Sequence, residues 1–204
     1  MLIMTSLVVV SLLVTSFFVR EYIKKREDEI IRQKIYSTAK LISTDKGIIA
    51  DLKRKQITPE IQEFANRVME DTGTDFVVIM DATFTRYTHP KNELIGEKFS
   101  NLEDVSSTFT AGDHFSKQSG QLGEGLRFFT AIKDEFGNNI GVVCVGYTKE
   151  TVKKQILHSQ EKILFALLIG ILFAVGLAIM YNRKLKKILL NYEPEEIAYN
   201  YIEK

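Results

Sequence analysis

The sequence contains one cysteine, Cys144, and almost no excess of either charge, with 27 lysines and arginines against 26 aspartates and glutamates in 204 residues. A single cysteine excludes an intramolecular disulfide framework, so a folded domain must rest on its hydrophobic core. A net charge of +1 gives no indication of a polyanionic partner, and no nucleic-acid binding is expected. Cys144 lies in an apolar run and is expected to be a buried hydrophobic residue rather than a reactive thiol.

Charge is missing altogether from two long segments. Residues 1–19 and residues 163–181 contain no charged side chain, and a helix needs about 20 apolar residues to cross the hydrocarbon core of a membrane. A signal peptide is the alternative for the first segment, but no small-residue cleavage pattern precedes a mature start. A buried core helix is the alternative for the second, and a charge-free run of this length argues against it. The pattern predicts transmembrane helices at 1–19 and 161–182.

Two spans place both chain ends on one side of the membrane and residues 20–160 on the other. Basic residues in short flanking segments favour the cytoplasmic side, and four of them follow the second span between Arg183 and Lys187 before any acid. Basic residues also follow the first span between Arg20 and Arg26, but long loops cross the membrane despite such charges. We therefore expect an extracytoplasmic domain at 20–160 and a cytoplasmic linker at 183–204.

The hydrophobic period changes along residues 20–160. Apolar residues recur at helical spacing over residues 21–45, and a second helical stretch follows Thr58 and Pro59, which suit an N-cap and a first helical turn. Three strand-like runs come next, DFVVIMD, RFFTAIKD and IGVVCVGYT, and the segment DEFGNN between the last two has the composition of a hairpin turn. The sequence predicts an α+β domain with an antiparallel sheet, a long N-terminal helix and a long polar connection over residues 91–123.

The sequence shows no recognisable catalytic motif. No nucleophile, base and orienting acid form a recognisable catalytic arrangement, and GQLGEG lacks the Lys-Ser/Thr of a phosphate-binding loop. His114 and His158 have no supporting pattern and are expected at the surface, and the acids at 27–29 are expected on a solvated helix face. We expect no catalytic residue, metal or cofactor in this chain.

Two long stretches together resemble one known family. They are DFVVIMDATFTRYTHPKNELIGEKF and GQLGEGLRFFTAIKDEFGNNIGVVCVGYTKE, with the shorter LNYEPEEIA near the C-terminus. The pair Arg-x-x-His, a glycine seven residues later and the Leu-Arg motif resemble the extracytoplasmic PAS-like, single Cache sensor domain of the citrate and C4-dicarboxylate sensor histidine kinases, the CitA/DcuS type. The resemblance implies an antiparallel sheet whose concave side holds a small di- or tricarboxylate.

The resemblance also implies which residues contact that ligand. Mapped onto this sequence they are Arg86, His89 and Arg127, with backbone groups around Gln121 and Leu122. Burying a dicarboxylate is costly unless charge-assisted hydrogen bonds replace its hydration, and arginine suits bidentate binding of a carboxylate. Without this context, the arginines would more simply belong to a salt-bridged surface.

Two differences from the family pattern concern the choice of ligand. The citrate-binding members of the family have a lysine where this chain has Phe129 and a threonine where it has Val78. With a cation and a hydroxyl missing, a trianion would be poorly compensated. These differences favour malate, succinate or fumarate over citrate, with Phe128 or Phe129 as a wall for the apolar middle of the ligand.

The resemblance implies the sensor and membrane module of a two-component histidine kinase, a multi-pass protein of a bacterial cell membrane. Nothing in the chain resembles a phospho-accepting histidine helix or the ATP-binding glycine boxes, so the kinase domain is expected elsewhere in a longer parent protein. The expected signal is a small piston-like movement of the second span within a homodimer embedded in lipid. Two alternatives stay open, the input domain of a chemoreceptor and a stand-alone membrane-tethered carboxylate-binding protein.

Overall fold

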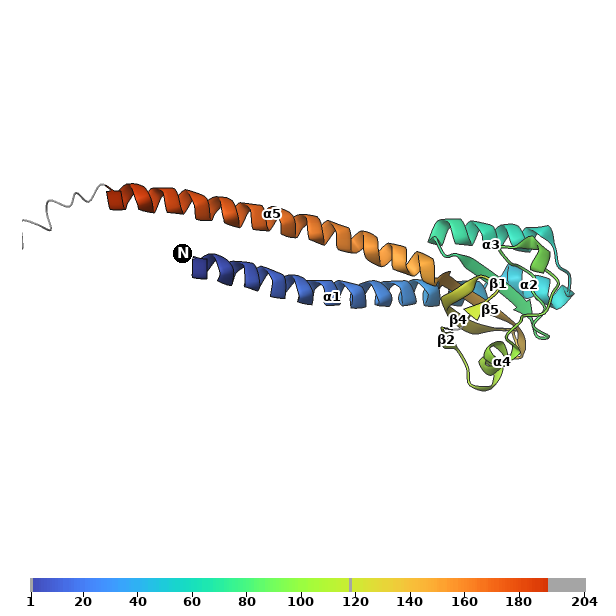
Figure 1. The fold of residues 1–204 in the computed structure, drawn as a ribbon. Coiled ribbons are helices and arrows are strands. Elements are labelled where there is room, and N and C mark those ends of the chain that lie inside the picture. The colour runs from blue at the N-terminus through green and yellow to red at the C-terminus, as the bar shows by residue number, and fades with distance from the viewer. Residues whose placement is uncertain (1, 118, 191–204) are drawn as a thin grey trace, which may run out of the picture. The chain divides into compact units, whose positions relative to one another are not determined.

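The structure is a computed structural model that describes residues 2–117 and 119–190 (Figure 1). The chain divides into two units, one containing residues 2–24 and 158–190 and the other Lys25–Leu157. Helix α1 (Leu2–Ser43) begins in the first unit and ends in the second, and helix α5 (Lys149–Leu190) runs from the second into the first. The helix expected over residues 21–45 is therefore confirmed as part of a longer one. Most of the expected cytoplasmic linker, residues 191–204, lies outside the described residues.

The first unit contains the two segments that lack charge. Among the residues that the structure describes, one helical segment, Lys149–Ile188, is long and apolar enough to cross a membrane; its most apolar 18 residues have a mean hydropathy of 3.0, and none of them is buried. The expected first span lies in α1, where Val10, Phe17 and Phe18 are exposed. The transmembrane assignments and the domain boundaries remain predictions.

The second unit is built on an antiparallel sheet. Its strands follow the order β1-β5-β4-β2, and a short strand β3 pairs with β4 outside this path. The strands are β1 (Phe76–Asp81), β2 (His114–Ser116), β3 (Ser119–Gly120), β4 (Gly123–Lys133) and β5 (Asn139–Thr148). The three strands expected from the sequence, β1, β4 and β5, are the three longest, and the α+β class is confirmed.

The turn between β4 and β5 forms as its composition predicts. One carboxylate oxygen of Asp134 accepts hydrogen bonds from the backbone amides of Phe136 and Asn138, and Gly137 adopts a φ of 83°. A positive φ of this size favours glycine, and an aspartate side chain bonded to the following amides stabilises a tight turn. The hairpin therefore sets the register of β4 against β5.

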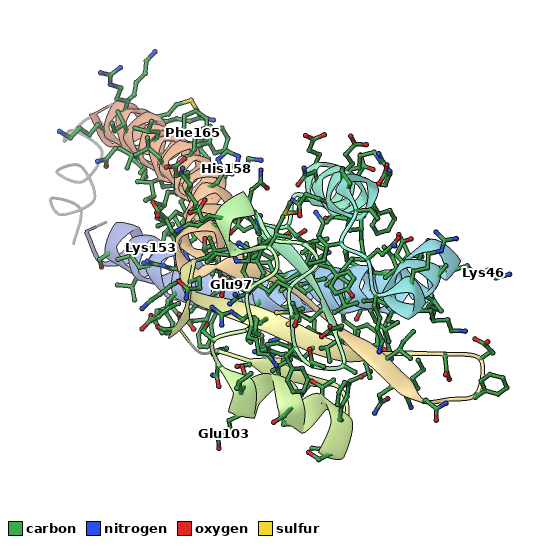
Figure 2. The ribbon with its side chains drawn as sticks, turned by 90° about the vertical axis from the view of Figure 1, so that its right-hand side faces the viewer. Lys46, Glu97, Glu103, Lys153, His158 and Phe165 are labelled. Carbon is green, nitrogen blue, oxygen red and sulfur yellow. The ribbon has the colours of Figure 1, made fainter. Side chains whose placement is uncertain are left out.

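Helices cover both faces of the sheet. Helices α1, α2 and α3 pack on one face, where their buried residues form a core with Val77, Ile79, Val143 and Val145. Helix α4 lies over the other face, because Val105 packs with Val78, Phe129 and Cys144. The bounds of the further elements are α2 (Lys46–Arg54), α3 (Pro59–Thr72), the 3₁₀ helix η1 (Asn92–Leu94) and α4 (Leu102–Thr110). In Figure 2, Lys46 and Glu103 project away from the core, as charged residues of α2 and α4 should.

Two local details differ from the sequence-based expectation. Thr58 occupies the N-cap position of α3 with an extended backbone, but its hydroxyl makes no capping hydrogen bond; Pro59 at the first turn leaves one fewer amide to cap. The long polar connection over residues 91–123 is also more regular than expected, because it contains η1, α4, β2 and β3. These elements enclose the side of the sheet on which the predicted ligand residues lie.

Candidate ligand-binding site

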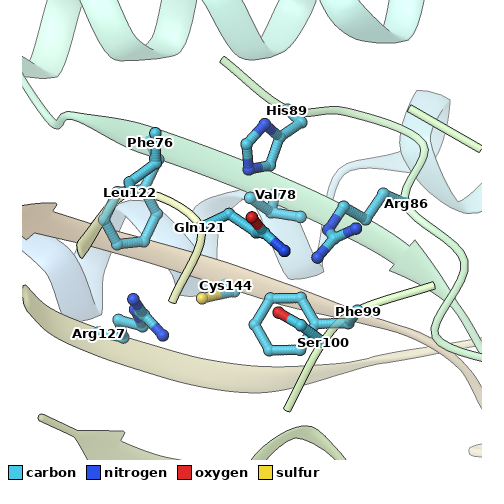
Figure 3. A pocket seen from close by; sticks show the side chains of 10 residues that line it. All are labelled: Phe76, Val78, Arg86, His89, Phe99, Ser100, Gln121, Leu122, Arg127 and Cys144. Carbon is cyan, nitrogen blue, oxygen red and sulfur yellow. The ribbon is translucent and has the colours of Figure 1, made fainter. Parts of the chain in front are cut away.

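A small cavity lies on the face of the sheet that α4 covers (Figure 3). Its walls come from β1, β4, β5, the segment after β1 and the turn between β3 and β4. The lining residues are Phe76, Val78, Arg86, His89, Phe99, Ser100, Gln121, Leu122, Arg127 and Cys144. The cavity volume is about 20 Å³, which is room for about one water molecule.

Arg86 enters the cavity from a segment that is fixed on two sides. Its backbone amide donates to the Glu97 carbonyl at 3.0 Å, and its carbonyl accepts from Gly96 at 2.8 Å. The guanidinium carbon lies 5.3 Å from the centre of the Phe99 ring, and the side chain is 2% exposed. Burial lowers the pKa of Arg86, while the field of Glu97 acts in the opposite direction. An arginine nevertheless stays protonated in a protein, so a buried positive charge stands on this wall.

Arg127 brings a second cation to the cavity from the middle of the sheet. One of its Nη atoms donates to the Gly123 carbonyl at 3.0 Å, and the guanidinium lies 5.7 Å from the centre of the Phe76 ring. Gly146 lies between Arg127 and Phe76 in the strand register. A Cβ atom at Gly146 would lie 2.5 Å from Phe76 Cζ, so a glycine is needed there for the aromatic ring to lie beside Arg127.

His89 supplies a third polar group, and its neighbours determine which ring nitrogen carries the proton. The backbone amide of Lys91 lies 3.0 Å from His89 Nδ1 and can only donate, so the neutral ring carries its proton on Nε2. When the ring is protonated, Nδ1 can donate instead to the Lys91 carbonyl at 3.2 Å. Burial is the main cause that lowers the pKa of His89, so the ring is neutral near pH 7. Figure 3 shows the ring reaching toward Val78 on the cavity floor.

The charge partners of Arg86 and Arg127 decide what the cavity can bind. In the part of the chain that the structure describes, neither Arg86 nor Arg127 forms an ion pair with a carboxylate. The buried Nε of Arg86 has no hydrogen-bond partner either. Removing a charge from water is costly unless a partner compensates it. Two buried guanidiniums that face one cavity and form no ion pair among the described residues favour the binding of an anion there.

The structure brings five of the six predicted ligand residues together. Arg86, His89, Arg127, Gln121 and Leu122 all line the cavity. Figure 3 shows the Gln121 side chain over Val78 with its amide on the side of Arg86, so this residue offers a side chain in addition to the expected backbone groups.

Phe129 does not line the cavity. It is 0% exposed and packs edge-on against Phe99, with 5.8 Å between ring centres. Phe128, the other expected wall, belongs to the core on the opposite face of the sheet. The aromatic walls of the cavity are Phe76 and Phe99, which the sequence analysis did not single out. Strand alternation could have found Phe76, because it shares a face of β1 with Val78.

His114 is not the simple surface residue that the sequence suggested. Its ring stacks on Phe129 at 5.3 Å, its Nδ1 lies 3.0 Å from the Gly112 carbonyl, and its Nε2 lies 3.4 Å from a carboxylate oxygen of Asp104. Strand β2 places it there, opposite Phe129 in register with β4. The sequence analysis missed this strand and therefore the position of the ring.

The fold that surrounds this cavity is that of a single cache domain. The model of the family "Single cache domain 3" matches residues 23–161, and the chain belongs to this family.

Curated relatives extend the comparison beyond the domain. A "Probable C4-dicarboxylate sensor kinase" of Bacillus subtilis is 29% identical over 198 residues, which cover 97% of this chain and 37% of the relative. The "Sensor histidine kinase DcuS" of Escherichia coli K12 is 30% identical over 168 residues, covering 82% of this chain and 31% of the relative. The chain thus spans about a third of the length of the curated relatives that it matches.

Solved structures of two histidine kinase sensor domains have a fold similar to that of this chain. The crystal structure of the E. coli DcuS sensor domain has a TM-score of 0.57 and 27% identity, and the match covers 64% of this chain and 96% of that one. The sensor domain of the Vibrio cholerae histidine kinase DctB has a TM-score of 0.58 at 14% identity and shows the same fold.

Proposed function

We propose that this chain is the sensor module of a membrane histidine kinase and that its cavity binds a C4-dicarboxylate. The observation that carries the proposal is the pair of buried guanidiniums, Arg86 and Arg127, that face one cavity and form no ion pair with a carboxylate of the described residues. A four-carbon dianion supplies one carboxylate for each arginine. His89 Nε2 is a third donor for one of these carboxylates, and Val78 and Cys144 form an apolar floor for the carbon chain.

Charge balance favours a dicarboxylate over citrate. The lining residues carry two permanent positive charges, from Arg86 and Arg127, and His89 is neutral near pH 7 in the empty site. A dianion matches this charge, whereas a trianion leaves one carboxylate to be desolvated without a cation. Malate, succinate and fumarate are therefore the preferred ligands.

Binding must enlarge the cavity. A volume of about 20 Å³ holds about one water molecule, and a C4-dicarboxylate is several times larger. Gln121 and Leu122, in the turn between β3 and β4, line the cavity without belonging to a strand of the main sheet. We expect this turn to shift when the ligand binds, because the strands of the sheet are fixed by their hydrogen bonds.

We propose that the ligand signal leaves the domain through β5 and α5. Strand β5 contributes Cys144 to the cavity, and α5 follows it directly at Lys149. A small movement of β5 along its own axis would displace α5 in a piston-like manner. A ligand can shift this equilibrium only by its difference in affinity for the two positions. In this proposal the chain forms a homodimer in a bacterial cell membrane, which residues 1–19 and 161–182 span. The cache domain is extracytoplasmic, and the kinase activity belongs to the parent protein.

Calorimetric titration of the full chain in lipid nanodiscs tests the binding proposal. We expect succinate, malate or fumarate to bind more tightly than citrate, and Arg86→Ala to weaken binding by about 100-fold because it removes charge-assisted hydrogen bonds in a buried site. The control is Arg67→Ala, which removes an exposed arginine of α3 that lies outside the cavity and pairs with Glu63. A folded wild-type chain that binds none of the four acids would overturn the proposal.

Single cysteines introduced at the two ends of residues 161–182 test the piston. We expect succinate to change their labelling by a membrane-impermeant maleimide in opposite directions at the two ends. Unchanged labelling at both ends, in a sample that binds succinate, contradicts the piston.

A further inference from the structure

One residue outside the cavity holds the backbone of His89 from both sides. The side-chain oxygen of Gln62, on helix α3, accepts a hydrogen bond from the His89 amide at 3.0 Å, and its side-chain nitrogen donates to the His89 carbonyl at 3.1 Å. The two residues are 27 positions apart in the sequence. The carboxamide thus pairs with the His89 peptide as a neighbouring strand would, at the point where the pairing with β1 ends.

The orientation of the Gln62 carboxamide is fixed by the His89 amide, which can only donate and therefore needs the side-chain oxygen of Gln62 opposite it. The carboxamide nitrogen also donates to the side-chain oxygen of Asn66, one helical turn further along α3, at 2.8 Å. With the oxygen turned toward the His89 amide, the nitrogen is the atom left for the His89 carbonyl and for Asn66. Nearby Ile61 and Ala65 are buried against the sheet, so α3 gives the carboxamide a rigid base.

The contact decides where the imidazole lies. The segment before His89 is held by β1, because Thr88 donates its hydroxyl to the Val77 carbonyl and accepts from the Ile79 amide. On the other side, Lys91 is bonded to the ring itself. Between these two anchors, the described residues provide only Gln62 as a partner for the His89 amide and carbonyl. With this partner removed, a 4% exposed histidine would keep two unsatisfied backbone groups or swing away from the cavity.

We propose that Gln62 is a positioning residue of the ligand site, which sets affinity for the carboxylate by holding His89 in place without touching the ligand. The inference rests on the proposed function, because His89 matters for binding only if the cavity takes an anion. It adds a residue of α3 to a site whose other members come from the sheet and its connections.

The test compares Gln62→Met with Glu63→Met in the full chain in nanodiscs. Methionine keeps the length of the side chain but makes none of the three hydrogen bonds of Gln62. Glu63 is an exposed neighbour on the same helix that pairs with Arg67 rather than with His89. We expect Gln62→Met to weaken succinate binding by about tenfold and Glu63→Met to leave it within twofold. In a His89→Ala background, Gln62→Met should change affinity by less than about twofold, because the residue that it positions is gone.

A second readout needs no ligand. Nuclear magnetic resonance of ¹³C-labelled histidine gives the pKa of His89, with its signal assigned by its loss in His89→Ala. Burial lowers this pKa, with Arg86 and Lys91 acting in the same direction and Glu93 and the Lys91 carbonyl opposing them. A ring released from Gln62 gains access to water, so its pKa should rise toward the ordinary value in Gln62→Met and stay unchanged in Glu63→Met.

The outcomes separate the two proposals. Wild-type succinate affinity in Gln62→Met, in a preparation where Arg86→Ala loses binding, overturns the positioning role and leaves the proposed function standing. A wild-type chain that binds none of the acids overturns the proposed function, and the pKa of His89 then still decides whether Gln62 holds the ring. An unchanged His89 pKa in Gln62→Met overturns the positioning role in either case.

Discussion

The carboxylate of Asp75 accepts hydrogen bonds from both the backbone amide and the hydroxyl of Thr148, each at 2.7 Å. Its other oxygen accepts from the Thr151 hydroxyl at 3.1 Å. Asp75 directly precedes β1, and Thr148 is the last residue of β5, immediately before α5. A carboxylate is also favourable at the N-terminus of a helix. One side chain therefore joins the start of a cavity-lining strand to the start of the helix that we propose carries the signal.

Replacing Asp75 should destabilise the contact between the start of β1 and the start of α5. Asp75→Ala removes the acceptor of all three hydrogen bonds, and we expect a local loss of about 2 kcal/mol. That loss corresponds to amide hydrogen exchange about 30-fold faster at Thr148 and Thr151. Asp71→Ala is the control, because Asp71 is an exposed acid at the end of α3. Unchanged exchange at Thr148 in the Asp75 variant would show that other contacts hold the start of β1 to the start of α5.

Succinate binding should depend on pH through His89. Burial lowers the pKa of the free ring, and a bound carboxylate raises it because the charged form gains a partner. Affinity should therefore increase as the pH falls through the pKa of the complex, by up to about tenfold per pH unit, and level off below the pKa of the free ring. His89→Ala should remove this dependence, and His158→Ala, at an exposed position, should keep it.

The same residue predicts how the stability of the ligand-free protein varies with pH. A histidine whose pKa is lowered by folding takes up a proton when the chain unfolds. The contribution of His89 to the free energy of unfolding is fully present above the pKa of the unfolded chain, about 6.5. It is lost as the pH falls through the lowered pKa of the folded protein. Hydrogen exchange of the domain at several pH values measures this. In the His89→Ala variant that part of the loss should be absent.

Val78→Thr should shift ligand preference toward citrate. Val78 lies on the cavity floor, and a hydroxyl there adds a hydrogen-bond donor for an additional carboxylate. We expect the ratio of citrate to succinate affinity to rise by about 3- to 10-fold. Val77→Thr is the matched control, because the neighbouring residue faces the core on the opposite side of the sheet. An equal change of the ratio in both variants would mean that the cavity floor does not select the ligand.

The thiol of Cys144 should be unreactive toward alkylating reagents in the native chain. Cys144 lines the cavity, and burial raises the pKa of its thiol to about 12. Since the thiolate is the reactive form, labelling by iodoacetamide at pH 7.5 should be at least about 1000-fold slower than for a free thiol and should become rapid in denaturant. Labelling of the native chain at the rate of a free thiol would show that the cavity opens to solvent without ligand.

The main strands and the charged residues of the site could be predicted from the sequence, but the helix and the short strand that cover them could not. β1 and β5 are rich in β-branched residues, and the middle of β4 is rich in aromatic and other apolar residues. These patterns do not depend on distant contacts, and Arg86, His89 and Arg127 lie within or beside them. Helix α4 and strand β2 are short, with nine and three residues. Both are stabilised by packing against β4 rather than by local propensity, so their sequence reads as a polar connection.

Side-chain packing explains why Phe129, an expected wall of the ligand site, does not line the cavity. Alternation correctly places Phe129 on the same face of β4 as Arg127, but Phe99 and His114 come from distant segments and cover it. The role that we infer for Gln62 could not be read from the sequence either, because it depends on the distance between α3 and the segment after β1. These contacts arise only once the chain is folded.

A structure of the chain with succinate tests the central claim most directly. We predict one carboxylate bonded to Arg86 and His89, the other bonded to Arg127, and Gln121 displaced to enlarge the cavity. Succinate bound elsewhere, or bound in this cavity with one of the two arginines turned away from it, would contradict the account.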